Sequence, residues 1–242
     1  MRSCGLFGKK GVSHVEIILA FVIFIAAVGF ALYFFNPGDS DRLVGTSLTY
    51  AFREIKQNAS VGVETFSVVI DDVAVVTGGS DTIAMNFPGV EGKTRVETYD
   101  GEVLNSSHVA DIVNVNTDNW NGIDFLFVKF GEEFVETAGL SGTENATYYE
   151  IGSSNLKEVI SEKRILNLKD AYDADYYSLR GEDNFNLPDR VNFGFSLVFD
   201  DGSIEAEREI PASLEVFSDT ERVEVLRDGG EIVFADLMVK LW

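Results

Sequence analysis

The first strong pattern in the chain is a run of apolar residues near the N-terminus. Residues 17–35 (IILAFVIFIAAVGFALYFF) contain no charged residue and no Pro over 19 positions. A helix of this length spans ~28 Å, which is close to the hydrocarbon thickness of a bilayer. The sequence Asn36-Pro37-Gly38-Asp39 follows, and Pro and Gly are residues that end helices. We therefore expect a transmembrane helix over residues 12–36.

A second helical pattern follows these helix-breaking residues. Between Ser40 and Asn58 apolar residues recur at helical spacing, and Ser40 or Asp41 is placed to cap the first turn. This spacing predicts a short stalk helix, within residues 37–60, that packs one stripe on the globular part of the chain. The stripe consists of Val44, Leu48, Ala51, Phe52 and Ile55.

Beyond Ser60 the chain shows short runs of β-branched and aromatic residues divided by turn residues. Such runs predict the strands of an antiparallel sheet. Gly131 separates two of them, so residues 125–130 and 133–137 are expected to form a hairpin. The expected strands are 65–70, 73–77, 82–87, 94–99, 112–115, 124–130, 133–137, 191–199, 204–210, 222–226 and 232–241.

A helical pattern interrupts the strands over residues 155–181. Asn167 is placed to cap a helix whose apolar stripe is Leu168, Tyr172, Tyr176 and Leu179. This helix either separates two β lobes or covers a single sheet, and the spacing leaves both arrangements open. The expected fold class is α+β, with a transmembrane helix, a stalk helix, and a β-rich antiparallel domain over residues 61–242 that contains one additional helical segment.

Charge predicts the orientation of the chain and excludes one class of partner. The sequence holds 19 Lys and Arg against 40 Asp and Glu, a formal net charge of −21. Nucleic acid is not an expected partner, because phosphate binding depends on clustered Lys and Arg. Arg2, Lys9 and Lys10 precede the apolar run, and positive charge stays on the cytoplasmic side of a membrane. We expect a single-pass protein of the cell membrane with a cytoplasmic N-terminus and an extracellular C-terminal domain.

The residues ahead of the apolar run carry a recognisable motif. A secretory signal peptide is cut after its apolar stretch, beside small residues, but residues 31–37 (ALYFFNP) are bulky, so the helix should remain in the mature protein. Lys9-Lys10-Gly11 stands before the helix, and Glu16 is the fifth residue counted from Val12. With the apolar helix, this arrangement resembles the N-terminal motif of type IV pilins, pseudopilins and archaeal pilin-like proteins with class III signal peptides.

The resemblance implies a role for each residue of the motif. In that family a prepilin peptidase recognises the basic pair, here Lys9 and Lys10, and cuts after the small residue, here between Gly11 and Val12. Residues 1–11 would be a cytoplasmic leader. Glu16 would pair with the freed α-amine of a neighbouring subunit, since an opposite charge favours the ionised carboxylate at low dielectric. The implied function is a non-enzymatic subunit of a pilus-like filament, or of a related secretion or adhesion machine, that assembles with other pilin-like subunits.

An uncleaved membrane anchor would also explain a Lys pair and one Glu beside an apolar helix. The alternative function is therefore a monomeric, single-pass anchored module that binds a glycan or a cation outside the cell. Both functions place the C-terminal domain at the cell surface. Three Asn-X-Ser/Thr sites, at Asn58, Asn105 and Asn145, are possible glycosylation sites consistent with that location.

No established catalytic motif occurs in the sequence, and we expect no enzymatic activity. Ser106, Ser107, His108 and Asp111 supply the residue types of a nucleophile, a base and an orienting acid, but adjacency in sequence is not triad geometry. The only Cys is Cys4, so neither a disulfide framework nor a zinc site is expected. The acidic turns, none with EF-hand spacing, leave Ca²⁺ as a weak candidate, and no other cofactor is expected. They are Asp71-Asp72, Asp173 with Asp175, and Asp200-Asp201 with Glu205.

Overall fold

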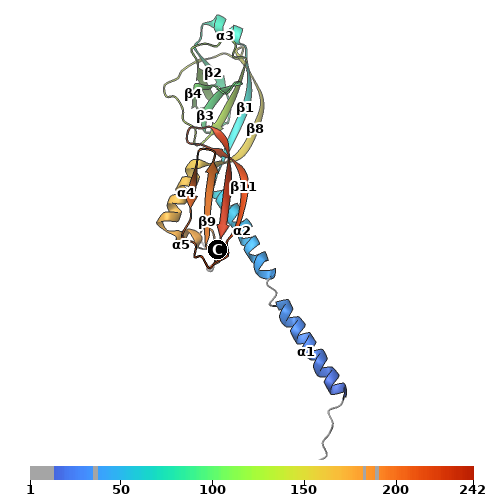
Figure 1. Cartoon of the computed structure of the whole chain (residues 1–242). Coiled ribbons are helices and arrows are strands. Elements are labelled where there is room, and N and C mark those ends of the chain that lie inside the picture. The colour runs from blue at the N-terminus through green and yellow to red at the C-terminus, as the bar shows by residue number, and fades with distance from the viewer. Residues whose placement is uncertain (1–13, 35–37, 182–183, 189–190) are drawn as a thin grey trace, which may run out of the picture. The chain divides into compact units, whose positions relative to one another are not determined.

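A computed structural model describes residues 14–34, 38–181, 184–188 and 191–242 (Figure 1). The chain divides into two units, Met1–Thr46 and Ser47–Trp242. The first unit contains α1 (His14–Phe34) and the first turns of α2 (Gly38–Ala59), and the rest of α2 belongs to the second unit. The second unit is α+β with a large, mostly antiparallel sheet, which confirms this part of the expected fold class.

After α2 the second unit alternates long runs of strands with three short helices. The elements are β1 (Ser60–Ile70), α3 (Asp72–Gly78), β2 (Thr82–Asn86), β3 (Lys93–Thr98), β4 (Val103–Val109), β5 (Ile112–Asn116), β6 (Phe125–Gly131), β7 (Thr143–Glu144), β8 (Tyr149–Ser161), α4 (Glu162–Ala174), α5 (Tyr176–Arg180), β9 (Phe193–Phe199), β10 (Gly202–Ala206), β11 (Phe217–Leu226) and β12 (Ile232–Leu241).

The strands form one twelve-stranded sheet in the order β10-β9-β12-β11-β8-β1-β6-β3-β4-β5-β2-β7. Neighbouring strands pair antiparallel, except for the short parallel contacts of β11 with β8 and of β2 with β7. β1 pairs with β6 along one edge and with β8 along the other. Because β1 begins directly after α2 and ends directly before α3, it crosses the second unit from the α2 end to the α3 end (Figure 1).

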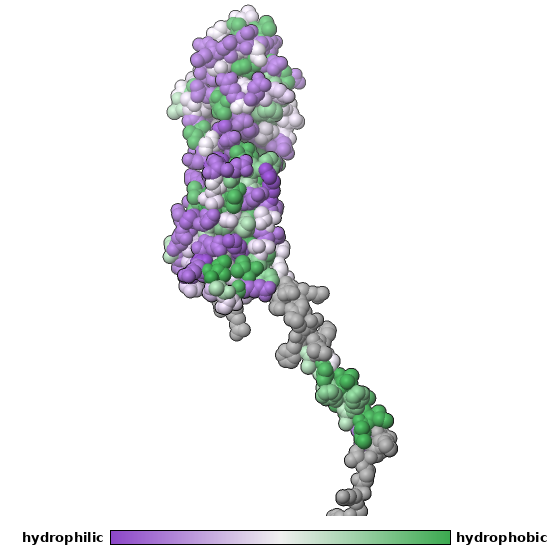
Figure 2. Space-filling view, viewed as in Figure 1, coloured by the Kyte–Doolittle hydropathy of each residue, from purple (hydrophilic) through white to green (hydrophobic). Residues whose placement is uncertain are grey.

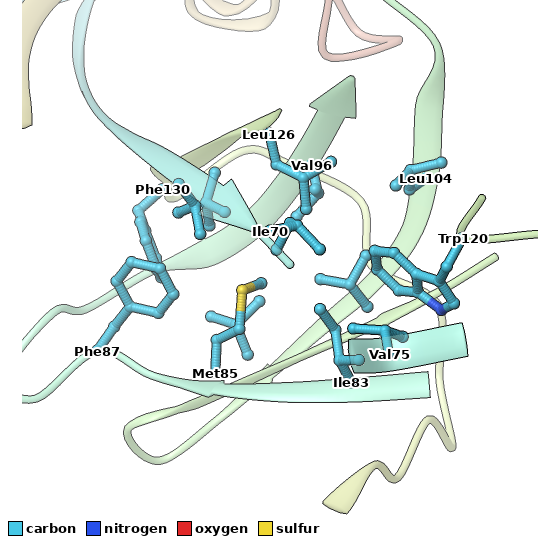
Figure 3. Packing of buried hydrophobic residues seen from close by; sticks show 14 residues of the cluster. Ile70, Val75, Ile83, Met85, Phe87, Val96, Leu104, Trp120, Leu126 and Phe130 are labelled. Carbon is cyan, nitrogen blue, oxygen red and sulfur yellow. The ribbon is translucent and has the colours of Figure 1, made fainter. Parts of the chain in front are cut away.

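The core near α3 is the larger described hydrophobic cluster. It combines buried residues of β1, β2, β3, β4, β5 and β6 with Val75 of α3 and Trp120 of a loop. In Figure 3, Leu126, Val96 and Phe130 face Ile83, Met85 and Phe87 across this core. Phe66, Phe87 and Phe130 pack edge to face with ring centroids 5.2–5.6 Å apart, the arrangement that aromatic quadrupoles favour.

The core near α2 depends on the helix stripe that the spacing predicts. Ala51, Phe52 and Ile55 are buried, while Leu48 is half-buried. α2 begins at Gly38, so the expected N-cap residues Ser40 and Asp41 lie inside the helix instead. Gly38 and Asp39, which the sequence places among the helix-breaking residues, are therefore part of α2.

One expected strand, residues 73–77, is a helix. Asp71 accepts a hydrogen bond from the N–H of Ala74 at 2.9 Å, and Gly79 (φ +67°) ends α3 in the left-handed conformation. These two caps outweigh the strand preference of the β-branched residues Val73 and Val76. Only Val75 of this helix is buried, so the segment packs one side chain rather than an alternating strand face.

The expected hairpin of residues 125–130 with 133–137 is also wrong. β6 pairs with β1 and β3, and residues 133–137 form no strand. The carboxylate of Glu136 instead accepts hydrogen bonds from the N–H groups of Thr94 and His108, at 2.7 and 2.9 Å. Residues 133–137 therefore contact β3 and β4 through the Glu136 side chain rather than pairing with β6.

The segment 155–181 differs from the expected single helix at both ends. β8 runs to Ser161, and Ser161 rather than Asn167 caps α4, accepting from the N–H of Arg164 at 3.0 Å. Asp175 then ends α4 and caps the separate helix α5, where its carboxylate accepts from the N–H of Ser178 at 3.1 Å. The expected apolar stripe is retained across both helices, because Tyr172, Tyr176 and Leu179 are all buried.

Candidate functional site

The N-terminal motif begins outside the part of the chain that the structure covers. Lys9, Lys10, Gly11 and Val12 lie outside the described residues. Glu16 lies in the first turn of α1 and is exposed. A negative charge is favoured at this end of a helix, because the N-terminal N–H groups and the helix dipole point toward it.

α1 exposes apolar side chains on every side. All described side chains from residue 16 to residue 31 are exposed, and apolar colour extends along this helix in Figure 2. In the part of the chain that the structure describes, no helix has both the length and the apolar character needed to cross a membrane. The large exposed apolar residues are Ile17, Ile18, Leu19, Phe21, Val22, Ile23, Phe24, Ile25, Val28 and Phe30.

The three Asn-X-Ser/Thr sites have different environments. Asn58, in the last turn of α2, donates through Nδ2 to the carbonyl of Glu54 at 2.8 Å. Asn105 is exposed on β4, but Ser107, whose hydroxyl completes that site, is buried. Asn145 lies between β7 and β8, where its Oδ1 accepts from the Thr147 hydroxyl at 2.8 Å. In the folded domain, Asn145 therefore has an exposed sequon hydroxyl and Asn105 does not.

The described hydrogen bonds of the triad-like set do not join its members to each other. Nδ1 of His108 lies 2.7 Å from the carbonyl oxygen of Gly92, and the imidazole packs edge to face on Phe130. Asp111 accepts from the N–H of Gly89 at 3.1 Å. The hydroxyl of Ser107 and Nε2 of His108 are buried without a hydrogen-bond partner among the described residues. The set is therefore not arranged as a nucleophile, a base and an orienting acid.

The acidic turns considered for calcium use their carboxylates within the fold. Asp71 and Asp175 cap helices, and Asp72 accepts from the N–H of Gly122 at 2.9 Å. Asp173 pairs with Lys169, and Asp201 pairs with Arg227. Among the described residues, no group of three or more His, Cys, Asp or Glu side chains is placed to hold a metal ion.

Glu97, Tyr172 and Tyr176 have shifted pKa values and form hydrogen bonds within or to strands of the sheet. Burial by itself would raise the pKa of Glu97, but hydrogen bonds from Arg95 and Lys129 outweigh it, so the pKa lies below the ordinary value. Burial raises the pKa of both Tyr172 and Tyr176 above the usual tyrosine range. The Tyr172 hydroxyl donates to the carbonyl of Phe193 at 2.7 Å, and the Tyr176 hydroxyl accepts from the N–H of Phe193 at 3.0 Å.

The sequence analysis did not predict a groove beside the end of β1. The groove has a volume of about 690 Å³ and is lined by residues 69–72 of one stretch and residues 146, 147, 149 and 150 of another. Only the pairing of β1 with β8 brings these two stretches together, with Ile70 opposite Tyr149. One sequence signal marks them both, because residues 65–92 and 130–156 contain no Lys and no Arg.

No family model, curated protein or solved structure matches the chain. The assignment of a function therefore depends on the chemistry and placement of this chain's own residues. Two features stand out from the rest of the molecule. One is the apolar helix α1 with Glu16 at its start, and the other is the groove at the far end of β1.

Proposed function

We propose that this chain is a non-enzymatic, type IV pilin-like surface protein, held by its N-terminal helix and processed by a prepilin peptidase between Gly11 and Val12. The observation that carries the proposal is the combination of Lys9-Lys10-Gly11, Glu16 and an uninterrupted apolar run over residues 17–35. Phe35, the last residue of that run, lies outside the described residues. The proposed role is a subunit of a pilus-like filament or of a related secretion or adhesion machine.

The character of α1 supports burial of this helix by something other than its own domain. A helix that is apolar on all sides has no face suited to water, and such helices are found inside membranes or inside large assemblies. Five described aromatic or β-branched side chains of α1 are at least 60% exposed, among them Phe21 at 63% and Phe30 at 65%. A membrane before assembly, and neighbouring helices after it, would cover the same surface.

Glu16 supports assembly rather than simple anchoring. A carboxylate at the start of an apolar helix is costly to bury in lipid unless a positive group accompanies it. Cleavage after Gly11 would create a new α-amine at Val12, four residues before Glu16, on every copy of the chain. Pairing of that amine with the Glu16 carboxylate of a neighbour would fix the axial register between two helices, because the attraction is strong only at short range in a low dielectric.

The mature N-terminus tests the proposal directly. Protein isolated from the cells that produce it should begin at Val12 when its N-terminus is sequenced. Gly11→Ile should block cleavage, because a β-branched side chain would enter the protease cleft, whereas Gly5→Ile changes another leader glycine and should leave cleavage intact. A chain that begins at Met1, or beyond Phe35, would contradict the processing claim.

Assembly needs a separate readout. Glu16→Gln should leave cleavage and folding unchanged but abolish high-molecular-weight assemblies in sheared cell-surface fractions viewed by electron microscopy. Glu91→Gln removes an exposed carboxylate from the outer domain and serves as the matched control. If both variants assemble equally well, Glu16 has no role in assembly. Cleaved chains that stay monomeric in every sample would favour the alternative function, an anchored module that binds a glycan or a cation.

A further inference from the structure

The end of the second unit opposite α2 is a distinct surface, which we call the distal end. β1 starts at Ser60, directly after α2, and reaches Ile70 ~33 Å away at the usual rise of a strand. The distal end consists of residues 69–82, 99–103, 116–125 and 143–150. Backbone bonds join three of these segments, from the N–H of Ile70 to the carbonyl of Asp124 and from the N–H of Asp71 to the carbonyl of Tyr148, both at 2.9 Å. The pairing of Thr98 with Leu126 places residues 99–103 at the same end of the sheet.

A groove lined by both apolar and acidic residues lies at this end. Its volume is about 690 Å³. Val69, which is 50% exposed, and the half-buried Tyr149 supply apolar surface, while Asp72 and Glu150 supply carboxylates. The full lining is Val69, Ile70, Asp71, Asp72, Ala146, Thr147, Tyr149 and Glu150. A groove of this composition can hold aliphatic side chains and cationic groups at the same time.

Further apolar side chains are exposed around the groove. Val73 and Val76 of α3 are 69% and 51% exposed, and Tyr99, in the turn between β3 and β4, is 77% exposed. Val103, at the start of β4, is 48% exposed. Figure 2 shows apolar patches among hydrophilic ones at this end. Together with Val69, these side chains give the distal end exposed apolar surface beside its carboxylates.

The charge of the distal end is entirely of one sign. Its four segments contain no Lys and no Arg. The surface therefore carries an uncompensated negative potential that attracts cations and repels anions. Its acids are Asp71, Asp72, Asp81, Asp100, Glu102, Asp118, Asp124, Glu144 and Glu150.

We propose that the distal end is a docking surface for a cationic segment of another protein, one that presents Lys or Arg together with aliphatic side chains. Charge complementarity selects this occupant, because only a ligand that is both basic and apolar can contact the carboxylates and the apolar side chains of the groove together. A second copy of this chain is disfavoured, since the chain carries a net charge of −21 and two distal ends would repel each other. Anionic lipids and nucleic acids are repelled for the same reason.

Binding of model peptides to the full-length chain in a neutral detergent tests the proposal, with a detergent-only blank. The probes are three labelled peptides of equal length, with alternating Lys–Val, Lys–Ser and Glu–Val. The Lys–Val peptide should bind most tightly, and its affinity should fall as salt is raised. Equal binding of the Lys–Ser peptide would reduce the site to a nonspecific charge effect and overturn the proposal, as would equal binding of the Glu–Val peptide or no binding at all.

Variants then locate the binding surface. Val69→Ser should weaken binding of the Lys–Val peptide about tenfold, the effect of losing roughly one buried aliphatic side chain. Glu150→Lys should weaken it by a similar factor and lessen its salt dependence. Val109→Ser and Glu91→Lys make the same changes at exposed positions outside the distal end and should leave the affinity within about twofold. Equal weakening by the control variants would overturn the location. N-terminal processing is a separate readout, so this proposal and the proposed function can fail independently.

Discussion

Arg164 offers a demanding test of how the second unit is held together, because one guanidinium joins three segments. Nη1 donates to the carbonyl of Ser60, where α2 meets β1, at 2.6 Å. Nε donates to Glu133 at 3.1 Å and Nη2 donates to Glu132 at 3.0 Å, in the segment after β6. Glu133 also accepts from the hydroxyl of Ser161 at 2.5 Å, so the cap of α4 belongs to the same network.

The magnitude follows from the exposure of each partner. Glu133 is 16% exposed and Glu132 is 76% exposed, so the bond to Glu132 contributes little after screening by water. A hydrogen bond to a charged, half-buried partner contributes about 1–1.5 kcal/mol at this exposure, and the bond to the Ser60 carbonyl about 1 kcal/mol. Arg164→Met keeps the aliphatic stem and should therefore lower the free energy of unfolding by about 2–2.5 kcal/mol. For a unit of this size the melting temperature would fall by roughly 5–10 °C.

Urea unfolding of the full-length chain, followed by near-ultraviolet circular dichroism, measures this difference. Arg53→Met is the matched control, because Arg53 is 66% exposed and its ion pair with Glu54 and its contact with the Tyr50 ring both lie within α2. This variant should lower the free energy of unfolding by less than about 0.5 kcal/mol. A double-mutant cycle of Arg164→Met with Glu133→Gln should give a coupling energy near 1 kcal/mol. Equal losses for the two Arg variants, or no coupling with Glu133, would refute the network as a source of stability.

Three further predictions concern individual buried groups. Glu97→Gln should lower the free energy of unfolding by about 1–2 kcal/mol at pH 7. The folded-state pKa of Glu97 lies below the ordinary glutamate value of 4.5, so its stabilisation is present above that value and is lost as the pH falls through the lowered pKa. Urea titrations at pH 7 and pH ~3 should therefore show a smaller acid effect in the variant. Tyr172→Phe should lower the free energy of unfolding by about 1 kcal/mol. Because burial raises the folded-state pKa of Tyr172, thermal melts should show that the variant loses less stability than the unmodified chain as the pH rises above 10.0. Ser107→Ala should be neutral or stabilising by up to ~1 kcal/mol in the same melts, because the hydroxyl is buried without a partner among the described residues, and a clear loss of stability would contradict that environment.

Periodicity predicted the helices and strands that have one buried face and one exposed face. The stripe of α2 is local, so Ala51, Phe52 and Ile55 could be assigned to the core from spacing alone. The bounds of β12 match the expected strand, because its apolar run is bordered by the turn at residues 228–230. In both elements one face is buried along most of the length, and this produces a regular sequence pattern.

The missed elements lack such a pattern for physical reasons. The middle of β8, from Gly152 to Glu158, is exposed on both faces, so its sequence has turn-like residues instead of alternation. β11 begins at Phe217, five residues before the expected start, because its first half is also exposed. In the opposite sense, residues 73–77 have a strand-like composition but are capped as a helix. Backbone pairing and capping decide these segments, and neither depends on a repeating burial pattern.

The N-terminal motif and the distal groove also differ in how far the sequence predicts them. The N-terminal motif is contiguous, so the sequence displays it in full. The distal groove combines residues 69–72 with residues 146–150, which only the register of β1 with β8 brings together. The absence of Lys and Arg from both stretches is visible in the sequence, but it acquires meaning only when the sheet places them at one end.

β1 physically links the region next to α2 with the distal groove. Val61 and Val63, near its start, belong to one hydrophobic cluster, whereas Val68 and Ile70, near its end, belong to another. Hydrogen bonds to β6 and β8 accompany β1 over most of the distance between the two clusters. Pulling on α2 would therefore load β1 along its length, and two paired strands would share that load. A second unit pulled at the end of α2 and bound at its distal end would thus carry tension through β1 and the strands paired with it.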